Sequence, residues 1–242
     1  MAVTVAIVGA GATGLACAAA LRRTAVVLDR IPVCGGILGF DHADTRRLEA
    51  AARAVGATLH LGETAITWDG AELVAMGQDG VRRIRAGCLV IASGARPRNR
   101  AELRIDGDRI HGVVSATVAC HLAETGVVVG RRPAIVGDGD WARRAEQELR
   151  HAGADPVRVA GRAIAIRGTE RVAELVCDDG TVVCDAVVLA DGLVPLRNVD
   201  GAVLDGVRTV YAQPCDDFGS IAAAEEAGRR AARDALEMMA GA

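Results

Sequence analysis

The sequence predicts an α/β fold of two domains, each with a parallel sheet covered by helices. Two Gly-x-Gly turns support this prediction, because each follows a short apolar strand and leads into a helix rich in Ala and Leu. They are Gly9-Ala10-Gly11-Ala12-Thr13-Gly14 and Gly137-Asp138-Gly139-Asp140-Trp141-Ala142. One such turn is a weak signal, whereas two in 242 residues predict two dinucleotide sites, or one site and a relic of a second.

The composition argues against several classes of function. A net charge of −3 gives no reason to expect nucleic acid or an anionic membrane as a partner, and no apolar run reaches the ~18 residues of a spanning helix. All 28 basic residues are Arg, which excludes Schiff-base lysine chemistry. The seven cysteines lack a framework spacing and no signal-peptide pattern is present, so we expect a reduced, cytoplasmic protein. The five histidines show no metal-binding spacing, so no metal is expected.

The first βαβ unit is predicted from the residues around the first turn. Val3–Val8 is a continuous apolar run, as a strand covered on both faces requires. A helix is predicted from about 12 to 22, and a second strand over 25–28. Asp29 ends that strand 20 residues after Gly9, where a carboxylate accepts the hydroxyls of an adenosine ribose.

The following segment predicts a helix, a β-meander and a further buried strand. Cys34-Gly35-Gly36 allows backbone to approach a ligand closely, because two of its residues lack side chains. Asp44 is predicted to cap a helix over 45–55 that stops at Gly56. The remaining features are hairpin turns at 69–70 and 79–80 and the apolar strand Cys88–Ala92, which runs into Ser93-Gly94.

The second half repeats this plan, with a βαβ unit, a meander and an apolar strand that runs into a Gly-containing loop. Asp178-Asp179-Gly180 is a hairpin turn, and Gly192 follows the last strand of the repeat. The predicted elements are strands over 134–136, 157–160, 172–177, 181–184, 186–190 and 207–212, with helices over 141–151 and 221–239.

This order of motifs resembles the two-dinucleotide-binding-domain flavoproteins, the superfamily of thioredoxin reductase and the pyridine nucleotide-disulfide oxidoreductases. The resemblance covers nearly the whole chain. It implies two Rossmann-like three-layer domains, with a discontinuous FAD-binding domain from residues 1–112 and 193–242. An inserted, shortened NAD(P)-binding-like domain is implied for residues 113–192. FAD is the implied cofactor, and the use of NADPH or NADH is left open.

The resemblance also implies which residues bind each dinucleotide. The first glycine motif and its acid match the family's site for the ADP part of FAD, and Ala92-Ser93-Gly94 matches its Ala-Thr-Gly loop. The second motif, with the loop after the second strand, matches the family's NAD(P)H site. The FAD residues so implied are Gly9, Gly11, Ala12, Thr13, Gly14, Asp29, Arg30, Gly35, Gly36, Ala92, Ser93, Gly94, Asp216, Gly219, Ser220 and Ile221. The NAD(P) residues so implied are Gly137, Gly139, Ala142 and Arg162.

The cysteines depart from the family pattern. No two of the seven have the C-x-x-C or C-x4-C spacing of a disulfide reductase, so dithiol exchange is not expected. Cys177 and Cys184 flank a hairpin turn, but its central residues place them out of register. Cys34 is the one thiol expected near a flavin and the one catalytic candidate, although a packed small residue is the commoner role of a free cysteine.

The motif before the last helix also departs from the family. The family reads Tyr-Ala-x-Gly-Asp there, and its acid binds the ribityl chain of the flavin. This chain has Pro214-Cys215 in place of Gly-Asp, unless Asp216 shifts into the position of the acid. The resemblance therefore predicts FAD in a looser or altered pose.

The second domain is shorter than the family's, which has a further crossover helix and strand after the second strand. Here Gly161 to Gly168 is all that separates that strand from the meander. Arg162 stands where the motif would have an acid, which favours the 2′-phosphate of NADPH. A vestigial site that serves only as a scaffold is the alternative.

Three functions therefore stay open. The first is an FAD-dependent oxidoreductase that passes hydride between flavin and NAD(P)H or a small organic substrate. The second is a flavoprotein subunit of a heteromeric amine, amino-acid or opine-type dehydrogenase, which the chain also resembles. The third is a degenerate nucleotide-binding scaffold without turnover. The expected partner is a small-molecule substrate or a dehydrogenase subunit, in a homodimer or a hetero-oligomer.

Overall fold

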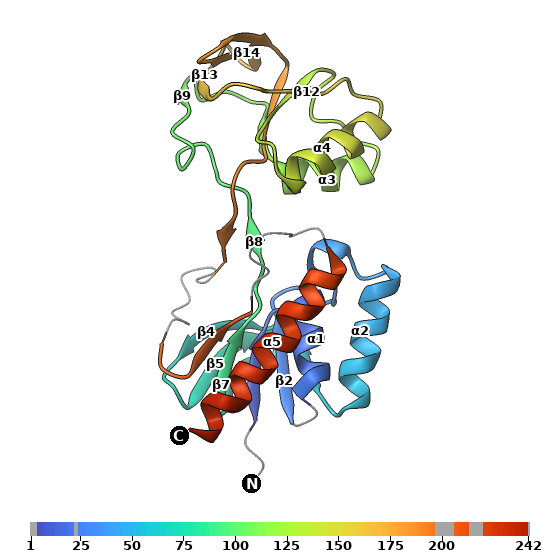
Figure 1. The fold of residues 1–242 in the computed structure, drawn as a ribbon, viewed down its shortest axis with the longest axis vertical. Helices are drawn as coiled ribbons and strands as arrows, with labels where there is room; N and C mark the ends of the chain where they lie inside the picture. Colours follow the sequence, from blue (N-terminus) through green and yellow to red (C-terminus); the bar gives the residue numbers. More distant parts are fainter. Residues whose placement is uncertain (1–3, 22–23, 197–205, 213–219, 242) are drawn as a thin grey trace. The chain divides into compact units, whose positions relative to one another are not determined.

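The computed structural model describes residues 4–21, 24–196, 206–212 and 220–241. Its contacts divide the chain into two compact units, Met1–Ala95 with Pro195–Ala242 and, inserted between these, Arg96–Val194 (Figure 1). Each unit contains a parallel sheet with helices on one face and a largely antiparallel sheet on the other. The predicted α/β class with two three-layer domains, one of them discontinuous, is confirmed.

The first unit is built on a five-stranded parallel sheet in the order β18-β7-β1-β2-β3. β1 lies at its centre and pairs on both sides, with Val5 opposite Ala25 in β2 and opposite Cys88 in β7. The strands are β1 (Val5–Val8), β2 (Ala25–Asp29), β3 (Thr58–Leu61), β7 (Cys88–Ile91) and β18 (Thr209–Tyr211).

Two different layers cover this sheet, because alternate residues of each strand point to opposite faces. Val5 and Ile7 pack with the helices, whereas Ala6 packs with the β-meander. The helices α5, α1 and α2 lie side by side on one face (Figure 1). These layers consist of α1 (Ala12–Leu21), α2 (Ala43–Ala54) and α5 (Ile221–Ala240), and of β4 (Thr64–Trp68), β5 (Glu72–Gly77) and β6 (Gly80–Arg85).

The cap of α2 differs from the prediction. The helix begins at Ala43, and the ring of His42 accepts a hydrogen bond from the Asp44 N–H at 3.2 Å, so His42 and not Asp44 is the N-cap. Asp44 lies in the first turn, where its carboxylate favours the positive helix end and accepts from Arg47 at 2.9 Å. Gly56 follows the last turn with φ +88°, as the predicted stop requires.

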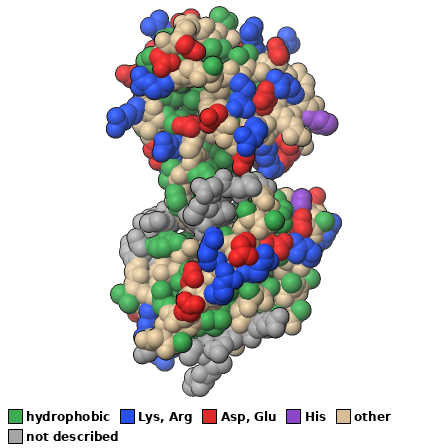
Figure 2. Space-filling view, in the orientation of Figure 1, with side chains coloured by type: hydrophobic (Ala, Val, Ile, Leu, Met, Phe, Trp, Pro, Cys, Tyr) green, Lys and Arg blue, Asp and Glu red, His purple; other side chains and the backbone are tan. Residues whose placement is uncertain are grey.

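The outer face of α5 is a solvated surface of paired charges. Figure 2 shows acidic and basic side chains mixed along the face where α5 runs. Arg229 pairs with Glu225 at 3.3 Å and with Glu226 at 3.0 Å. Exposed pairs of this kind contribute little stability each. None of the helices in the described ranges combines the length and apolarity needed to cross a membrane.

The second unit repeats the arrangement on a four-stranded parallel sheet in the order β10-β16-β11-β12. Leu189 in this sheet packs with Ile166 and Leu175 of the mixed sheet β15-β14-β13-β9, in which only β9 pairs parallel with its neighbour. The helices contact the strands of the parallel sheet. The elements are β9 (Asp106–Gly107), β10 (Val113–Ser115), α3 (Ala116–Glu124), β11 (Pro133–Val136), α4 (Asp140–His151), β12 (Val157–Arg158), β13 (Ala163–Gly168), β14 (Val172–Cys177), β15 (Gly180–Val183) and β16 (Ala186–Leu189).

The segment before β10 packs in the second unit. The guanidinium of Arg100 donates to the carbonyls of Ile105 at 2.9 Å and Gly107 at 2.7 Å, and β9 pairs with β13. The contacts thus divide the chain at 95–96, where the sequence suggests 112–113. At both crossings the chain forms a short strand, and these two, β8 (Ala95–Arg96) and β17 (Val194–Pro195), pair with each other.

We expect the second unit to lose stability in acid through Glu102. Its carboxylate accepts two hydrogen bonds from Arg96, at 2.7 and 2.9 Å, and one from the Asn99 N–H at 2.7 Å. These donors lower the pKa of Glu102 from 4.5 to about 2, with Arg96 the larger cause. A lowered pKa contributes stability that is fully present above pH 4.5 and is lost as the pH falls towards 2.

Urea unfolding between pH 6 and pH 2.5 measures this effect, with Glu102→Gln as the control. The wild-type midpoint is expected to fall more steeply between pH 4.5 and 2.5 than that of the variant. Parallel pH profiles for the two proteins would contradict this role of Glu102.

Candidate functional site

The first glycine motif forms the turn between β1 and α1, at the carboxyl edge of the parallel sheet. Gly9 has φ +112°, and a side chain there would overlap the carbonyl oxygen of Ala92 in the loop after β7. Gly14 packs directly on the Gly9 carbonyl. The turn is therefore fixed by the absence of side chains at two positions, and it brings Ala92 and Ser93 beside the start of α1.

The second glycine pair lies against the same turn. The N–H of Gly35 donates to the Ala10 carbonyl at 2.9 Å, and Gly11 forms a parallel bridge with Gly35. A Cβ on Gly11 would meet only the Cα of Gly36, at 4.0 Å. A side chain on Gly11 would therefore point towards the backbone of Gly36, with which its Cβ makes only an ordinary van der Waals contact.

Asp29 stands at the end of β2 beside this turn. Its Oδ2 accepts from the Ala10 N–H at 2.7 Å, and its Oδ1 accepts from the Ile31 N–H at 2.9 Å. Each carboxylate oxygen has a second lone pair, so the half-buried group keeps capacity for two further donors. The hydroxyls of a ribose are donors of that kind.

The first turn of α1 is suited to an anion. The first N–H groups of a helix have no acceptor within the helix, and the helix dipole is positive at that end. No acidic side chain lies in the first turn of α1. The helix α5 follows the parallel strand β18, so it begins at the same sheet edge, and Ser220 caps it by accepting from the Ala223 N–H at 3.2 Å.

The structure therefore brings most of the implied FAD residues to one edge of one sheet. These are Gly9, Gly11, Ala12, Thr13 and Gly14 in the turn and first helical turn, Asp29 and Arg30 after β2, Gly35 and Gly36 beside the turn, Ala92, Ser93 and Gly94 after β7, and Ser220 and Ile221 at the start of α5. Asp216 and Gly219 lie outside the described residues.

Cys34 lies next to this site as a buried, protonated thiol. Its side chain is 3% exposed. Burial, followed by the Glu49 carboxylate that it hydrogen-bonds, raises the pKa of Cys34 to about 12. A thiolate is the reactive form of cysteine, so these surroundings favour the packed role over the nucleophile.

Cys34 is accordingly expected to react slowly with iodoacetamide. At pH 8 the rate should be at least ~100-fold below that of a free cysteine with a pKa of about 8.5. Peptide mapping of the native protein measures the rate, and the same protein in urea provides the fully reactive control. Labelling of native Cys34 at the rate of the denatured chain would show an accessible thiolate instead.

The six cysteines that the structure describes form no disulfide with one another. Cys17, Cys34, Cys88, Cys120, Cys177 and Cys184 are all buried and free. Cys177 lies opposite Gly180 across the β14–β15 hairpin, and Cys184 follows the paired residues of β15. The predicted lack of register is confirmed. Dithiol chemistry therefore has no pair to use among these six residues.

The second glycine motif forms an equivalent turn between β11 and α4. Gly137 has φ +122° and lies against Ala190 and Asp191 at the end of β16, as Gly9 lies against the end of β7. Gly139 is the N-cap of α4, with nothing within 4 Å of a Cβ placed on it, and Ala142 is buried. The same glycine turn between a strand and a helix is thus present twice.

Arg162, the other implied NAD(P) residue, lies just beyond β12. Its N–H donates to Asp178 Oδ1 at 2.8 Å, and the Asp178 N–H donates back to the Arg162 carbonyl at 3.1 Å. The hairpin turn between β14 and β15 therefore lies against this segment. Sequence reasoning missed this contact, and it missed Asp191 at the position equivalent to Ser93, although Ala92-Ser93-Gly94 and Ala190-Asp191-Gly192 align as strand-end loops.

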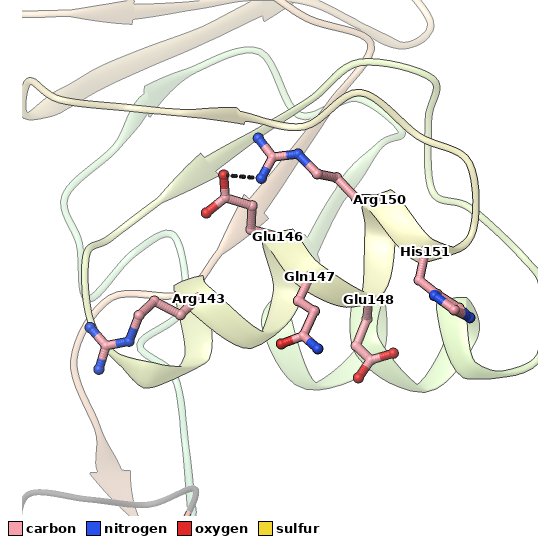
Figure 3. Close-up of a pocket in the computed structure, with 6 residues that line it drawn as sticks. All are labelled: Arg143, Glu146, Gln147, Glu148, Arg150 and His151. Carbon is pink, nitrogen blue, oxygen red and sulfur yellow. Dashed lines mark ion pairs between the residues drawn. The ribbon is translucent and has the colours of Figure 1, made fainter.

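A hollow on the surface of the second unit does not coincide with either turn (Figure 3). It is lined by Arg143, Glu146, Gln147, Glu148, Arg150 and His151, all from α4. Figure 3 shows Glu146 and Arg150 pointing towards each other, with an ion pair of 2.6 Å. Ligand sites are mostly apolar and converge from several elements, so this open and polar hollow on one helix is no candidate.

The described ranges contain no cluster of side chains suited to binding a metal ion. No group of three His, Cys, Asp or Glu side chains lies close enough together there to hold an ion.

Comparison with known proteins finds a family match for the first part of the chain. Residues 1–110 match the family model of the pyridine nucleotide-disulphide oxidoreductases. The resemblance predicted from the motifs is therefore confirmed, without a redox cysteine pair among the described residues. No curated protein sequence matches the chain.

Several solved structures of oxidoreductases share the fold of this chain over nearly its whole length. L-proline dehydrogenase from P. horikoshii is 21% identical with a TM-score of 0.73, over 98% of this chain and 55% of that one. Thioredoxin reductase from Lactococcus lactis is 17% identical with a TM-score of 0.68, over 99% and 100%. The water-forming NADH oxidase from Lactobacillus brevis, bound to NADH, is 14% identical with a TM-score of 0.63, over 97% and 69%. This chain spans about half of the proline dehydrogenase chain.

Proposed function

We propose that this chain is an FAD-dependent oxidoreductase whose flavin is held by the first unit and whose chemistry uses no dithiol. The observation that supports this most is the convergence of the first glycine turn, Gly35-Gly36 and Asp29 at one sheet edge. The family match of residues 1–110 covers all of these residues. When bound, FAD supplies hydride and electron-transfer chemistry.

The residues present fit the ADP part of FAD. The pyrophosphate would be held by backbone N–H groups of the first turn of α1, which no carboxylate in that turn opposes. Asp29 would accept the ribose hydroxyls with its remaining lone pairs. Gly11 and Gly36 would let the ligand approach the backbone, because a side chain at either position would project into the space between them.

A redox cycle of the reconstituted chain tests the proposal. The protein is saturated with FAD, freed of excess ligand, reduced anaerobically with dithionite and then exposed to an artificial electron acceptor. The bound flavin band near ~450 nm is expected to bleach and then to recover. A chain that holds no flavin after reconstitution would contradict the proposal and leave the scaffold alternative.

A second candidate is a flavoprotein component of an amino-acid or amine dehydrogenase. The observation that favours it is the similarity to L-proline dehydrogenase over 98% of this chain but 55% of that one. In this case amines and amino acids would leave the flavin of the isolated chain oxidised, whereas dithionite would reduce it. Reduction of the isolated chain by an organic substrate would exclude the need for a partner chain.

A further inference from the structure

We infer that carboxylates around the second glycine turn, Gly137–Ala142, keep the pyrophosphate of NADH or NADPH out of this turn. This inference rests on the proposed function, because it implies that neither NADH nor NADPH reduces the proposed flavin. The backbone of the turn is right for a dinucleotide, with Gly137 in the left-handed region and open space above Gly139. The side chains around it, however, are negatively charged, which disfavours a pyrophosphate.

The two turns of this chain can be compared position by position. Three positions that are neutral at the first turn are acidic at the second. The pairs are Ala10 and Asp138 between the glycines, Ala12 and Asp140 at the start of the helix, and Ser93 and Asp191 after the neighbouring strand. A pyrophosphate needs the positive helix end and its N–H groups, and carboxylates at these positions oppose it.

Two cations lie near these acids: Arg143, which is already engaged, and Arg98, whose side chain lies against Gly192 next to Asp191. Arg143 forms an ion pair with Asp140 and donates to the Asp138 carbonyl at 3.3 Å. In the described part of the chain, no ion pair neutralises the side chain of Asp138 or Asp191. A like charge a few ångströms away weakens anion binding by about tenfold at a partly exposed site, so these acids together cost at least about tenfold.

The other end of the expected groove is occupied by the chain itself. A dinucleotide of this fold places its adenosine ribose at the end of the second strand, here β12. The β14–β15 hairpin turn lies there, with Asp178 bonded to Arg162 and the Asp179 carboxylate in contact with Gly161. The 2′-phosphate of NADPH would meet two more carboxylates, and the turn leaves less room for either nucleotide.

Equilibrium binding of NADH and NADPH to the FAD-loaded chain tests this inference. Nucleotide fluorescence and equilibrium dialysis report binding directly, and the flavin spectrum of the same sample reports separately whether the proposed cofactor is present. The wild type is expected to show no saturable binding of either nucleotide below ~1 mM. Saturable binding of either one with a Kd below ~100 µM would overturn the inference.

A variant that copies the first turn into the second tests the cause. Asp138→Ala, Asp140→Ala and Asp191→Ser together are expected to strengthen nucleotide binding at least ~10-fold over the wild type. A folded triple variant with no gain in binding would overturn the role of the carboxylates.

A control variant separates this local effect from overall charge. Asp79, Glu170 and Asp234 are exposed acids outside the second turn, and replacing all three by Ala changes the net charge equally. The control is expected to bind neither nucleotide. A gain equal to that of the first variant would show an effect of net charge and would overturn the inference.

Discussion

Replacement of Gly11 by Val is expected to abolish FAD binding while the protein stays folded. Gly11 has no positive φ, and a Cβ there meets only the Gly36 Cα at 4.0 Å. The substitution is therefore expected to cause little strain in the ligand-free protein. The side chain would project into the space that a bound pyrophosphate needs next to the backbone. FAD affinity should fall at least ~100-fold, as measured by flavin fluorescence quenching.

The second turn offers a matched control for this variant. Gly139 occupies the equivalent position, and nothing lies within 4 Å of a Cβ on it. Gly139→Val is therefore expected to keep FAD affinity within about twofold of the wild type, with a similar melting temperature. Equal loss of FAD in both variants, or full binding by Gly11→Val, would contradict the assignment of FAD to the first turn.

A second large effect is expected at Gly228, where α5 crosses α1. Helix propensity alone predicts that Gly→Ala inside a helix stabilises by about 1 kcal/mol. A Cβ on Gly228, however, would overlap the Thr13 carbonyl oxygen and would lie 2.8 Å from the Cys17 nitrogen. Both are backbone atoms that cannot rotate away, so Gly228→Ala is expected to destabilise by about 1–3 kcal/mol.

Urea unfolding followed by circular dichroism measures this reversal of sign. Ala222→Val, at an exposed position of the same helix, serves as the control and should change stability by less than about 1 kcal/mol. Because Thr13 lies in the first turn of α1, Gly228→Ala should also weaken FAD binding. A Gly228→Ala protein more stable than the wild type would show that the helices can separate at this crossing.

The elements that a short local sequence pattern specifies could be predicted from the sequence. Both glycine turns, the apolar strands before them and the Asp-Gly hairpins lie where their residues predict. The reason is that each of these features is specified by a few neighbouring residues. Gly9, for example, is required both by its own φ and by the adjacent Ala92 loop, and the motif alone predicts such a turn.

Features that depend on tertiary contacts were not predicted. The strand β13 is interrupted by two register shifts that obscure its alternation. The helix α3, capped by the Ser115 hydroxyl, was also missed, although its buried residues Ala116, Ala119, Cys120 and Ala123 have helical spacing. The helix α2 begins at Ala43 because His42 supplies the cap, and His is not among the usual capping residues. The contact of Asp178 with Arg162 joins two loops, and no local sequence pattern predicts it.

The two units thus share a backbone plan and differ in chemistry. The first turn combines an uncharged helix start with Asp29 at the neighbouring strand end, which suits FAD. The second turn has acids at the equivalent positions, which suits a unit kept for its fold or for contact with another molecule. Under the proposals above, the electron donor is to be sought among organic substrates or partner chains before pyridine nucleotides.

The ratio of flavin to protein chain tests whether this chain binds FAD, and whether it does so at the first turn alone. The purified protein is saturated with FAD, excess ligand is removed, and the bound flavin is released, identified by chromatography and quantified against the protein. We expect about one FAD per chain, and the same ratio for Gly139→Val. A ratio near zero would contradict FAD binding by this chain, and a ratio of about two would show that the second turn accepts a dinucleotide after all.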